Sequence, residues 1–226
     1  MTTSDQLPPS DRVRLRRGAA RGRYDRDVVH AILDDALIAH VGVSTPDGPL
    51  VLPMAFGRTD DELYLHGASA NGLLRAAIDP AAAGGGELCA TVTEVDGLVL
   101  ARTPFHNSMN YRSVVVRGTG RRVDDPDEHL EALRIITDHV VATWDDGRPP
   151  SPSELRRTLV IALPLDEASA KVRAGDPIDE PDDLDGPHWA GTVALGREWG
   201  PPRPAADLRT DAVAPRDLLE RFGPIR

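Results

Sequence analysis

A histidine directly before a run of small residues is the strongest chemical signal in this chain. His66 ends the apolar stretch 63–65 and precedes the segment GASAN. Small residues let the backbone approach a ligand closely, and an imidazole donates a hydrogen bond or moves a proton near neutral pH. His66 is therefore a candidate catalytic residue. Its structural alternative is a histidine that ends the strand by bonding to the backbone.

The segment after His66 is expected to form an elbow between a strand and a short helix. Leucine, alanine and isoleucine side chains recur at helical spacing over residues 73–78, and Asn71-Gly72 is a turn signal. Free N–H groups at the start of a helix attract phosphate. The elbow residues that we place beside a ligand are Gly67, Ala68, Ser69 and Asn71.

A second group of polar residues precedes a valine-rich run. Tyr111, Arg112 and Ser113 come directly before Val114–Val116. Arg112 offers a positive charge for phosphate, and Ser113 offers a hydroxyl group. So many polar side chains beside a buried strand predict the edge of a site, with a polar hairpin tip as the alternative.

Apolar and β-branched runs separated by turn residues predict a mainly β protein of the α+β class. Asp96-Gly97 predicts a two-residue hairpin, Pro53 predicts an edge strand or bulge, and residues 166–174 predict a polar turn or short helix. Strands are expected at 38–45, 50–56, 63–66, 89–95, 98–103, 111–120, 158–165 and 192–197, and helices at 28–37, 72–79 and 126–141. Short antiparallel strands with three inserted helices favour a small barrel over a sandwich.

Four segments carry a resemblance to a known family. LYLHGA (63–68), LVLARTPFHNSMNYRSVVVRG (98–118), ALPLDEASAKVRAGDPIDE (162–180) and HWAG (188–191) resemble the pyridoxamine 5'-phosphate oxidase-like flavoproteins, above all the nitroimidazole-resistance-type branch. The resemblance covers residues 12–197. It implies an antiparallel six- to seven-stranded split β-barrel with peripheral helices, and FMN bound at the interface of a homodimer.

The resemblance also assigns roles to residues around the flavin. The backbone of Pro53, Met54 and Ala55 would line the edge of the isoalloxazine ring, and His66 would face the flavin or substrate. Relatives carry basic residues for the phosphate at positions that match Asn71 and Gly72. That charge is absent here, so either Arg112, Arg75 or the N-terminal arm replaces it, or the phosphate is bound more weakly.

Three further candidates come from the resemblance, each with a structural alternative. Lys171 and Arg173 match a K-x-R segment and contact the cofactor or form a capping group of ion pairs. Trp189 is a core or interface aromatic residue, or a wall over the flavin contributed across the dimer interface.

Composition bounds the remaining possibilities. A formal net charge of −10 argues against nucleic acid and anionic membranes as partners, and Cys89, the one cysteine, excludes an intrachain disulfide. No metal site is expected. The absence of a long apolar run or leader segment predicts a cytoplasmic protein with no membrane span. We divide the chain into a basic arm (1–23), an FMN-binding domain (24–198) and a tail (199–226) packed on the surface or on a partner.

The predicted function is that of an FMN-dependent oxidoreductase acting on a small molecule, such as a nitro compound or quinone. The electron donor would dock transiently, because no G-x-G-x-x-G segment is present. Oxidation of pyridoxamine phosphate itself is not expected, since the basic elbow is missing. The alternatives are a flavin-storage protein, a deazaflavin-dependent reductase, and a haem-binding relative with His66 or His106 as the axial ligand.

Overall fold

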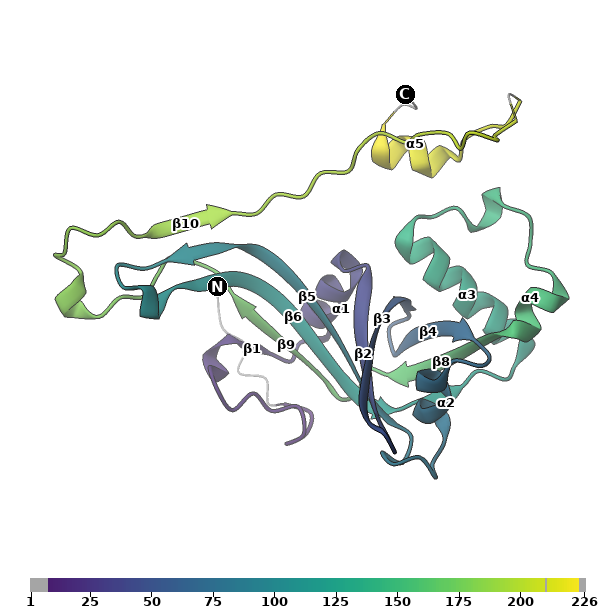
Figure 1. Cartoon of the computed structure of the whole chain (residues 1–226), viewed down its shortest axis with the longest axis horizontal. Helices are drawn as coiled ribbons and strands as arrows, with labels where there is room; N and C mark the ends of the chain where they lie inside the picture. Colours follow the sequence, from purple (N-terminus) through teal and green to yellow (C-terminus); the bar gives the residue numbers. More distant parts are fainter. Residues whose placement is uncertain (1–7, 210, 224–226) are drawn as a thin grey trace.

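A computed structural model describes residues 8–209 and 211–223, which form one curled antiparallel sheet with helices on both sides (Figure 1). The strands are β1 (Gly22–Arg23), β2 (Ile38–Thr45), β3 (Gly48–Arg58), β4 (Glu62–Ala68), β5 (Glu87–Leu100), β6 (Ser108–Thr119), β7 (Arg121–Arg122), β8 (Thr158–Pro164), β9 (Ala168–Arg173) and β10 (Gly191–Ala194). The sheet order is β1-β9-β6-β5-β2-β3-β4-β8-β7, and β10 pairs with the outer half of β5. The expected split barrel is confirmed, with more strands than the six to seven predicted.

Five α-helices accompany the sheet in the described residues. They are α1 (Arg26–Asp35), α2 (Gly72–Ile78), α3 (Pro126–Val140), α4 (Pro152–Arg157) and α5 (Arg216–Phe222). Asp125 caps α3 by accepting from the N–H groups of Asp127 and Glu128, and Pro126 follows in the first turn, as its fixed φ favours. No helix of the described residues is long and apolar enough to cross a membrane.

The main core fills the concave side of the curl. Along β5, the side chains of Leu88, Ala90 and Val92 point into this core, while Cys89 and Thr91 point outward. This two-residue alternation is what a half-buried strand requires. Helices α1 and α2 close the core with the buried side chains Val29, Ile32, Leu33, Leu73, Leu74 and Ala77.

Helix α3 lies on the other side of the sheet, over β3, β4 and β8. It makes a second, smaller core with Tyr64, Val160 and Ala162. A Cβ at Gly57 would fall 2.7 Å from the carbonyl oxygen of Ile135, so glycine is what lets this helix lie so close to β3. The convex face beyond α3 is left open.

The predicted hairpin at Asp96-Gly97 is wrong, because β5 continues through it to Leu100. The register with β6 shifts between Val95 and Gly97, so the dipeptide forms a β-bulge rather than a turn. A Cβ at Gly97 would lie 2.5 Å from the carbonyl oxygen of Val193. The glycine therefore serves the close approach of β10.

The segment 166–174 is also corrected, from a polar turn or short helix to strand β9. Its alternation is visible in the sequence: Ala168 and Ala170 face the core, while Ser169 and Lys171 point to the opposite face. The strand was not predicted because its core-facing residues are small alanines and the residues between them are polar, a composition that is also typical of turns.

The arm and the tail pack differently. In the described part of the arm, Val13 is buried and β1 pairs with β9. The tail leaves β10, runs across the molecule and ends in α5, beside α3 in Figure 1. There Arg221 Nη1 donates to the carbonyl oxygen of Val140 at 2.9 Å.

Candidate functional site

The open convex face of the sheet brings together several of the residues singled out from the sequence. In the register of β9, β6 and β5, Lys171 lies opposite Ser113, and Ser113 lies opposite Thr93. Opposite residues of an antiparallel pair point to the same face, so these three side chains form a row. Tyr111 lies two residues from Ser113 on β6 and shares this face.

The row continues across β2, β3 and β4. Ile38 lies opposite Ala55, and extending the register that pairs Phe56 with Leu65 places His66 level with Ala55. Pro53 is exposed and half-buried Ala55 follows on the same face, while Met54 lies between them and points into the core. Residues from six strands thus line one shallow, largely uncharged surface.

His66 is a partly buried titratable group on this surface. Its Nδ1 is buried without a hydrogen-bond partner among the described residues, and burial lowers the pKa of the imidazole. The ring is therefore neutral at pH 7, and an unpaired buried nitrogen is costly unless a ligand or a metal orders the ring. Nε2 is the nitrogen left to meet a ligand.

The elbow differs from the expected phosphate cradle. The N–H of Ser69 donates to the carbonyl oxygen of Arg157 at 2.8 Å, and that of Asn71 donates to Ala68 at 2.8 Å. The side chain of Asn71 accepts from Leu73 and Leu74 and so caps α2 itself. Because these donors are already used, little backbone is left for a phosphate, and α2 is only seven residues long.

The structure does not support Arg112 as a phosphate ligand. Its side chain is on the concave side, where Nη2 contacts Asp96 at 2.9 Å and Nη1 contacts Asp35. Hydrogen bonds to both carboxylates raise the pKa of Arg112. Neighbouring residues of a strand point to opposite faces, so Arg112 and Ser113 could not both meet the same ligand.

Arg173 and Trp189 also lie away from His66. Arg173 is buried, where it donates from Nη1 to Gly175 and from Nη2 to Asp176, both at 3.1 Å, and contacts Asn110. Burial lowers its pKa. It therefore clamps the loop after β9. Trp189 is 66% exposed just before β10 and does not reach the His66 surface within this chain.

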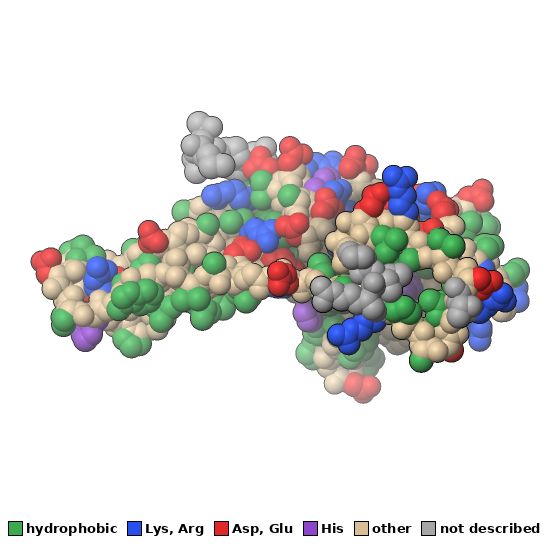
Figure 2. All heavy atoms as spheres, turned by 90° about the horizontal axis from the view of Figure 1, so that it is seen from above, with side chains coloured by type: hydrophobic (Ala, Val, Ile, Leu, Met, Phe, Trp, Pro, Cys, Tyr) green, Lys and Arg blue, Asp and Glu red, His purple; other side chains and the backbone are tan. Residues whose placement is uncertain are grey.

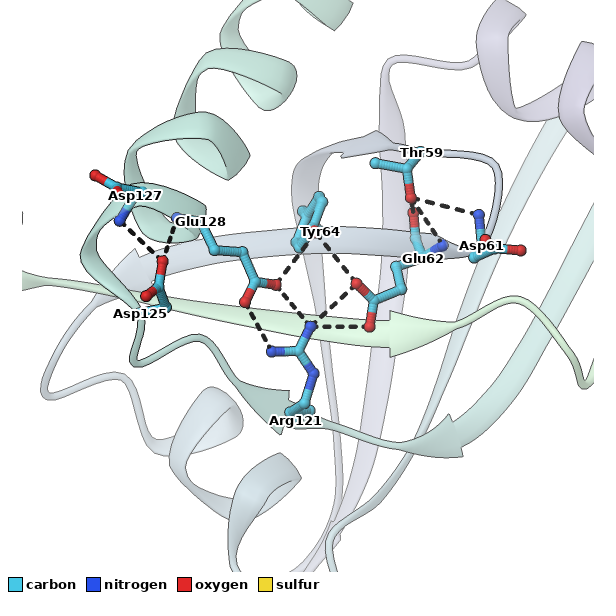
Figure 3. Close-up of polar contacts among 8 residues, drawn as sticks. All are labelled: Thr59, Asp61, Glu62, Tyr64, Arg121, Asp125, Asp127 and Glu128. Atoms are coloured by element: carbon cyan, nitrogen blue, oxygen red, sulfur yellow. Dashed lines mark hydrogen bonds and ion pairs between the residues drawn. The ribbon is translucent and has the colours of Figure 1, made fainter.

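A polar cluster fixes the other end of β4 (Figure 3). Arg121 Nη2 lies 2.9 Å from Glu62 and 2.6 Å from Glu128, and the hydroxyl of Tyr64 donates between the same two carboxylates. Burial and the two negative charges raise the pKa of Tyr64, while Arg121 lowers that of Glu128. The cluster joins β4 to α3 and so holds the strand that presents His66.

The sequence analysis missed a group of arginines beside the elbow. A cavity of about 220 Å³ is lined by Arg75, Arg122 and Arg156 together with Ser69 and Thr158. Only Arg75 was considered before, and as one of several substitutes. Arginines this far apart along the chain give no spacing signal, because the fold alone brings them together. In the described residues, no group of three or more His, Cys, Asp or Glu side chains is placed to hold a metal ion.

A curled antiparallel sheet with helices packed on both sides defines a split-barrel protein. A sequence profile described as pyridoxamine 5'-phosphate oxidase matches residues 25–172, and the chain belongs to that family. No curated protein sequence matches the chain.

Three solved structures resemble the chain over much of its length. The flavocytochrome Anf3 from Azotobacter vinelandii is 36% identical over 96% of this chain and 100% of its own, with a TM-score of 0.89. The FAD- and haem-binding protein from Mycobacterium smegmatis is 30% identical over 90% and 98%, with a TM-score of 0.82. A 5-nitroimidazole resistance protein from Bacteroides thetaiotaomicron is 28% identical over 67% and 86%, with a TM-score of 0.54.

Proposed function

We propose that this chain is a redox protein that binds a flavin and a haem on the convex face around His66. The observation that carries the proposal is the neutral, half-buried imidazole with an unpartnered Nδ1. Two similarities that cover 96% and 90% of the chain support it, since one is to a flavocytochrome and the other to an FAD- and haem-binding protein. A bound flavin exchanges electrons in pairs or singly, and a haem exchanges them singly.

His66 is the residue that would ligate the haem iron. Neutral imidazole is a common iron ligand, and burial keeps His66 neutral where a proton would otherwise compete. The rival, His106, lies at the tip of the β5–β6 ribbon, stacked edge-on against Phe105 and 3.9 Å from Glu180. His66 is better placed because small residues surround it on the sheet.

The flavin ring is proposed to lie along the same face. Pro53 and Ala55 supply a flat apolar floor, and Gly67 and Ala68 permit close approach at the elbow. Lys171 and Ser113 supply donors at the far end of the row. The chain's own part is then to orient the ring, exclude water and place a cation near its polar edge. FMN, predicted from the sequence, remains a candidate beside FAD.

We propose a homodimer as the complete form of the site. Large apolar side chains are exposed on the convex face and on the β5–β6–β10 ribbon, where Figure 2 shows hydrophobic groups gathered on the lobe at the left. They are Ile38, Val51, Leu98, Met109, Trp189 and Val193. Exposed apolar groups in such number mark an interaction surface. A second copy would cover the flavin and bring its own Trp189 toward it.

The absorbance spectrum of the purified protein, loaded with flavin and haem, tests the proposal. We expect flavin bands together with a Soret band in the wild type. His66→Ala removes the Soret band and keeps the flavin bands, while His106→Ala keeps both. If the Soret band is lost in His106→Ala and kept in His66→Ala, His106 is the haem ligand and His66 is not. A wild type that shows neither flavin nor haem bands would refute the proposal.

A further inference from the structure

The arginine-lined cavity beside the elbow has the chemistry of an anion site. Arg75 Nε donates to the carbonyl oxygen of Ser69 at 2.9 Å, which holds its guanidinium over the elbow. Arg122 is paired with Asp124 at 2.8 Å. Within the described ranges, neither Arg75 nor Arg156 forms an ion pair with a carboxylate. Three guanidinium groups thus line one cavity of about 220 Å³, and Asp124 is the one carboxylate that lines either this cavity or the adjoining one.

This concentration of positive charge is unusual for the chain, whose net charge is −10. Most arginines of the described residues pair with carboxylates, such as Arg58 with Asp34 and Arg148 with Glu154. Like charges that face a common space repel unless an anion lies between them. Guanidinium groups match phosphate oxygens in geometry and charge. The backbone donors of the elbow are already used, so side chains must supply the contacts here.

A second cavity continues the first. It measures about 320 Å³ and shares Arg122, Arg156, Thr158 and Leu159 with the smaller one. Its remaining walls are the apolar Val123, Pro126, Leu155 and Val160, with His129 and the carboxylate of Asp124 at its polar edge. The imidazole Nε2 of His129 lies 3.2 Å from the carbonyl oxygen of Thr158. An apolar slot that opens from a cationic cavity fits a flat heterocycle carried on a phosphate chain.

The slot also lies next to the proposed flavin site. Val160, which lines it, is directly opposite His66 in the pairing of β4 with β8. Neighbouring strands are about 4.8 Å apart, so the slot begins one strand from the imidazole. Ser69 lines the smaller cavity from the elbow that follows His66.

We infer that Arg75, Arg122 and Arg156 bind the pyrophosphate of a dinucleotide flavin, and that the slot between α3 and α4 binds its adenosine. The inference rests on the proposed flavin site and selects FAD over FMN as its ligand. Arg75 lines only the cavity at the elbow and meets the phosphate nearest the flavin. Arg156 lines both cavities and meets the part of FAD that FMN lacks.

The test is to titrate the flavin-free full-length protein with FAD, FMN, riboflavin and ADP. The wild type is expected to bind FAD at least tenfold more tightly than FMN. Arg156→Gln weakens FAD binding about tenfold and FMN binding less than threefold, because one charge-assisted contact is lost. Arg75→Gln weakens FAD and FMN alike and leaves riboflavin unchanged. Arg157→Gln is the matched control, since this neighbour on α4 lines neither cavity.

Equal affinity for FAD in Arg156→Gln and wild type overturns the inference, as does equal affinity of the wild type for FAD and FMN. Thermal melts of each variant check that the fold is intact. ADP separates this inference from the flavin proposal. If no flavin binds but ADP binds and loses affinity in Arg156→Gln, the arginine site stands without the flavin. If neither binds, the arginine site is refuted as well.

Discussion

At the scale of single residues, the burial of His66 couples stability to pH. Burial holds the pKa of its imidazole below the value of about 6.5 in the unfolded chain. Below that pH the unfolded chain therefore binds more protons than the folded one, and the free energy of unfolding falls. We expect His66→Gln to show a shallower loss of stability than wild type between pH 7 and pH 5, measured by urea unfolding.

The same titration bears on the proposed haem site. If His66 ligates the iron, a proton on its imidazole would compete with the metal, so haem affinity of the wild type is expected to fall over the same pH range. His139→Gln, which removes the contact of Nε2 with the carbonyl oxygen of Ala36 at 2.7 Å, measures what replacing a histidine elsewhere in the fold costs in stability. Identical slopes in wild type and His66→Gln would show that the imidazole is not the group responsible.

The cluster around Arg121 gives a second prediction at this scale. Arg121→Gln leaves Tyr64 with two unneutralised carboxylates, Glu62 and Glu128. Because Arg121 is 47% exposed, we expect a loss of only about 1 kcal/mol at pH 7. The lowered pKa of Glu128 stabilises the fold above about pH 4.5, and this stabilisation is lost as pH falls. The free energy of unfolding of the variant should therefore decrease less than that of the wild type when the pH is lowered.

Chemical denaturation from pH 7 to pH 3 measures both effects. Tyr64→Phe is the companion variant, since it removes the hydroxyl group and keeps the ion pairs of Arg121. If Arg121→Gln loses as much unfolding free energy at acidic pH as the wild type does, Glu128 owes its lowered pKa to another group.

At the scale of elements, the approach of α3 to β3 depends on one missing side chain. A Cβ at Gly57 meets the backbone of Ile135 at 2.7 Å, and backbone cannot turn aside. Gly57→Ala should therefore displace α3 and cost about 2 kcal/mol of unfolding free energy. Gly72→Ala, with no atom within 4 Å of its Cβ, should leave stability unchanged or raise it by about 0.5 kcal/mol. Equal melting temperatures for the two variants would contradict this packing.

Elements with strong local sequence signals were predicted well. Elements whose conformation depends on contacts with distant parts of the chain were not. Strand 38–45 and the helix after Pro126 follow from periodicity and capping, which act over a few residues. The bulge at Asp96-Gly97 forms because β10, about 95 residues later, pairs with β5. No local pattern distinguishes such a bulge from a hairpin. The same limit applies to Arg112, whose partner Asp35 comes from a distant helix.

At the scale of the whole molecule, the convex face is predicted to be covered by a second copy. Val51→Glu places a charge on this face near the turn between β2 and β3, where 58% of the valine is now exposed, and should convert a dimer to a monomer in light scattering. Leu130→Glu, at a residue that is 39% exposed on α3, should leave the mass unchanged. A monomeric wild type, or a dimeric Val51→Glu, would count against the interface.

The site was predictable in part for a reason that belongs to this scale. His66 and the elbow residues lie in one continuous segment, so their proximity is encoded in the chain order. The arginines of the cavity come from α2, β7 and α4, and only the folded sheet unites them. The family resemblance pointed to the residues of the proposed flavin face, but it gave no sign of the arginines at the cavity.

Strand β10 carries a consequence for how the chain is made. The outer half of β5 has β6 on one side, and among the described residues its other side is paired only by 191–194. A ribosome must therefore synthesise most of the chain before that edge can be closed. Until then the nascent protein exposes a long strand edge with apolar Leu98, the kind of template on which unfinished chains join one another. Chains that stop before Gly191 would keep that edge open permanently, so aggregation of prematurely terminated products is built into the strand order.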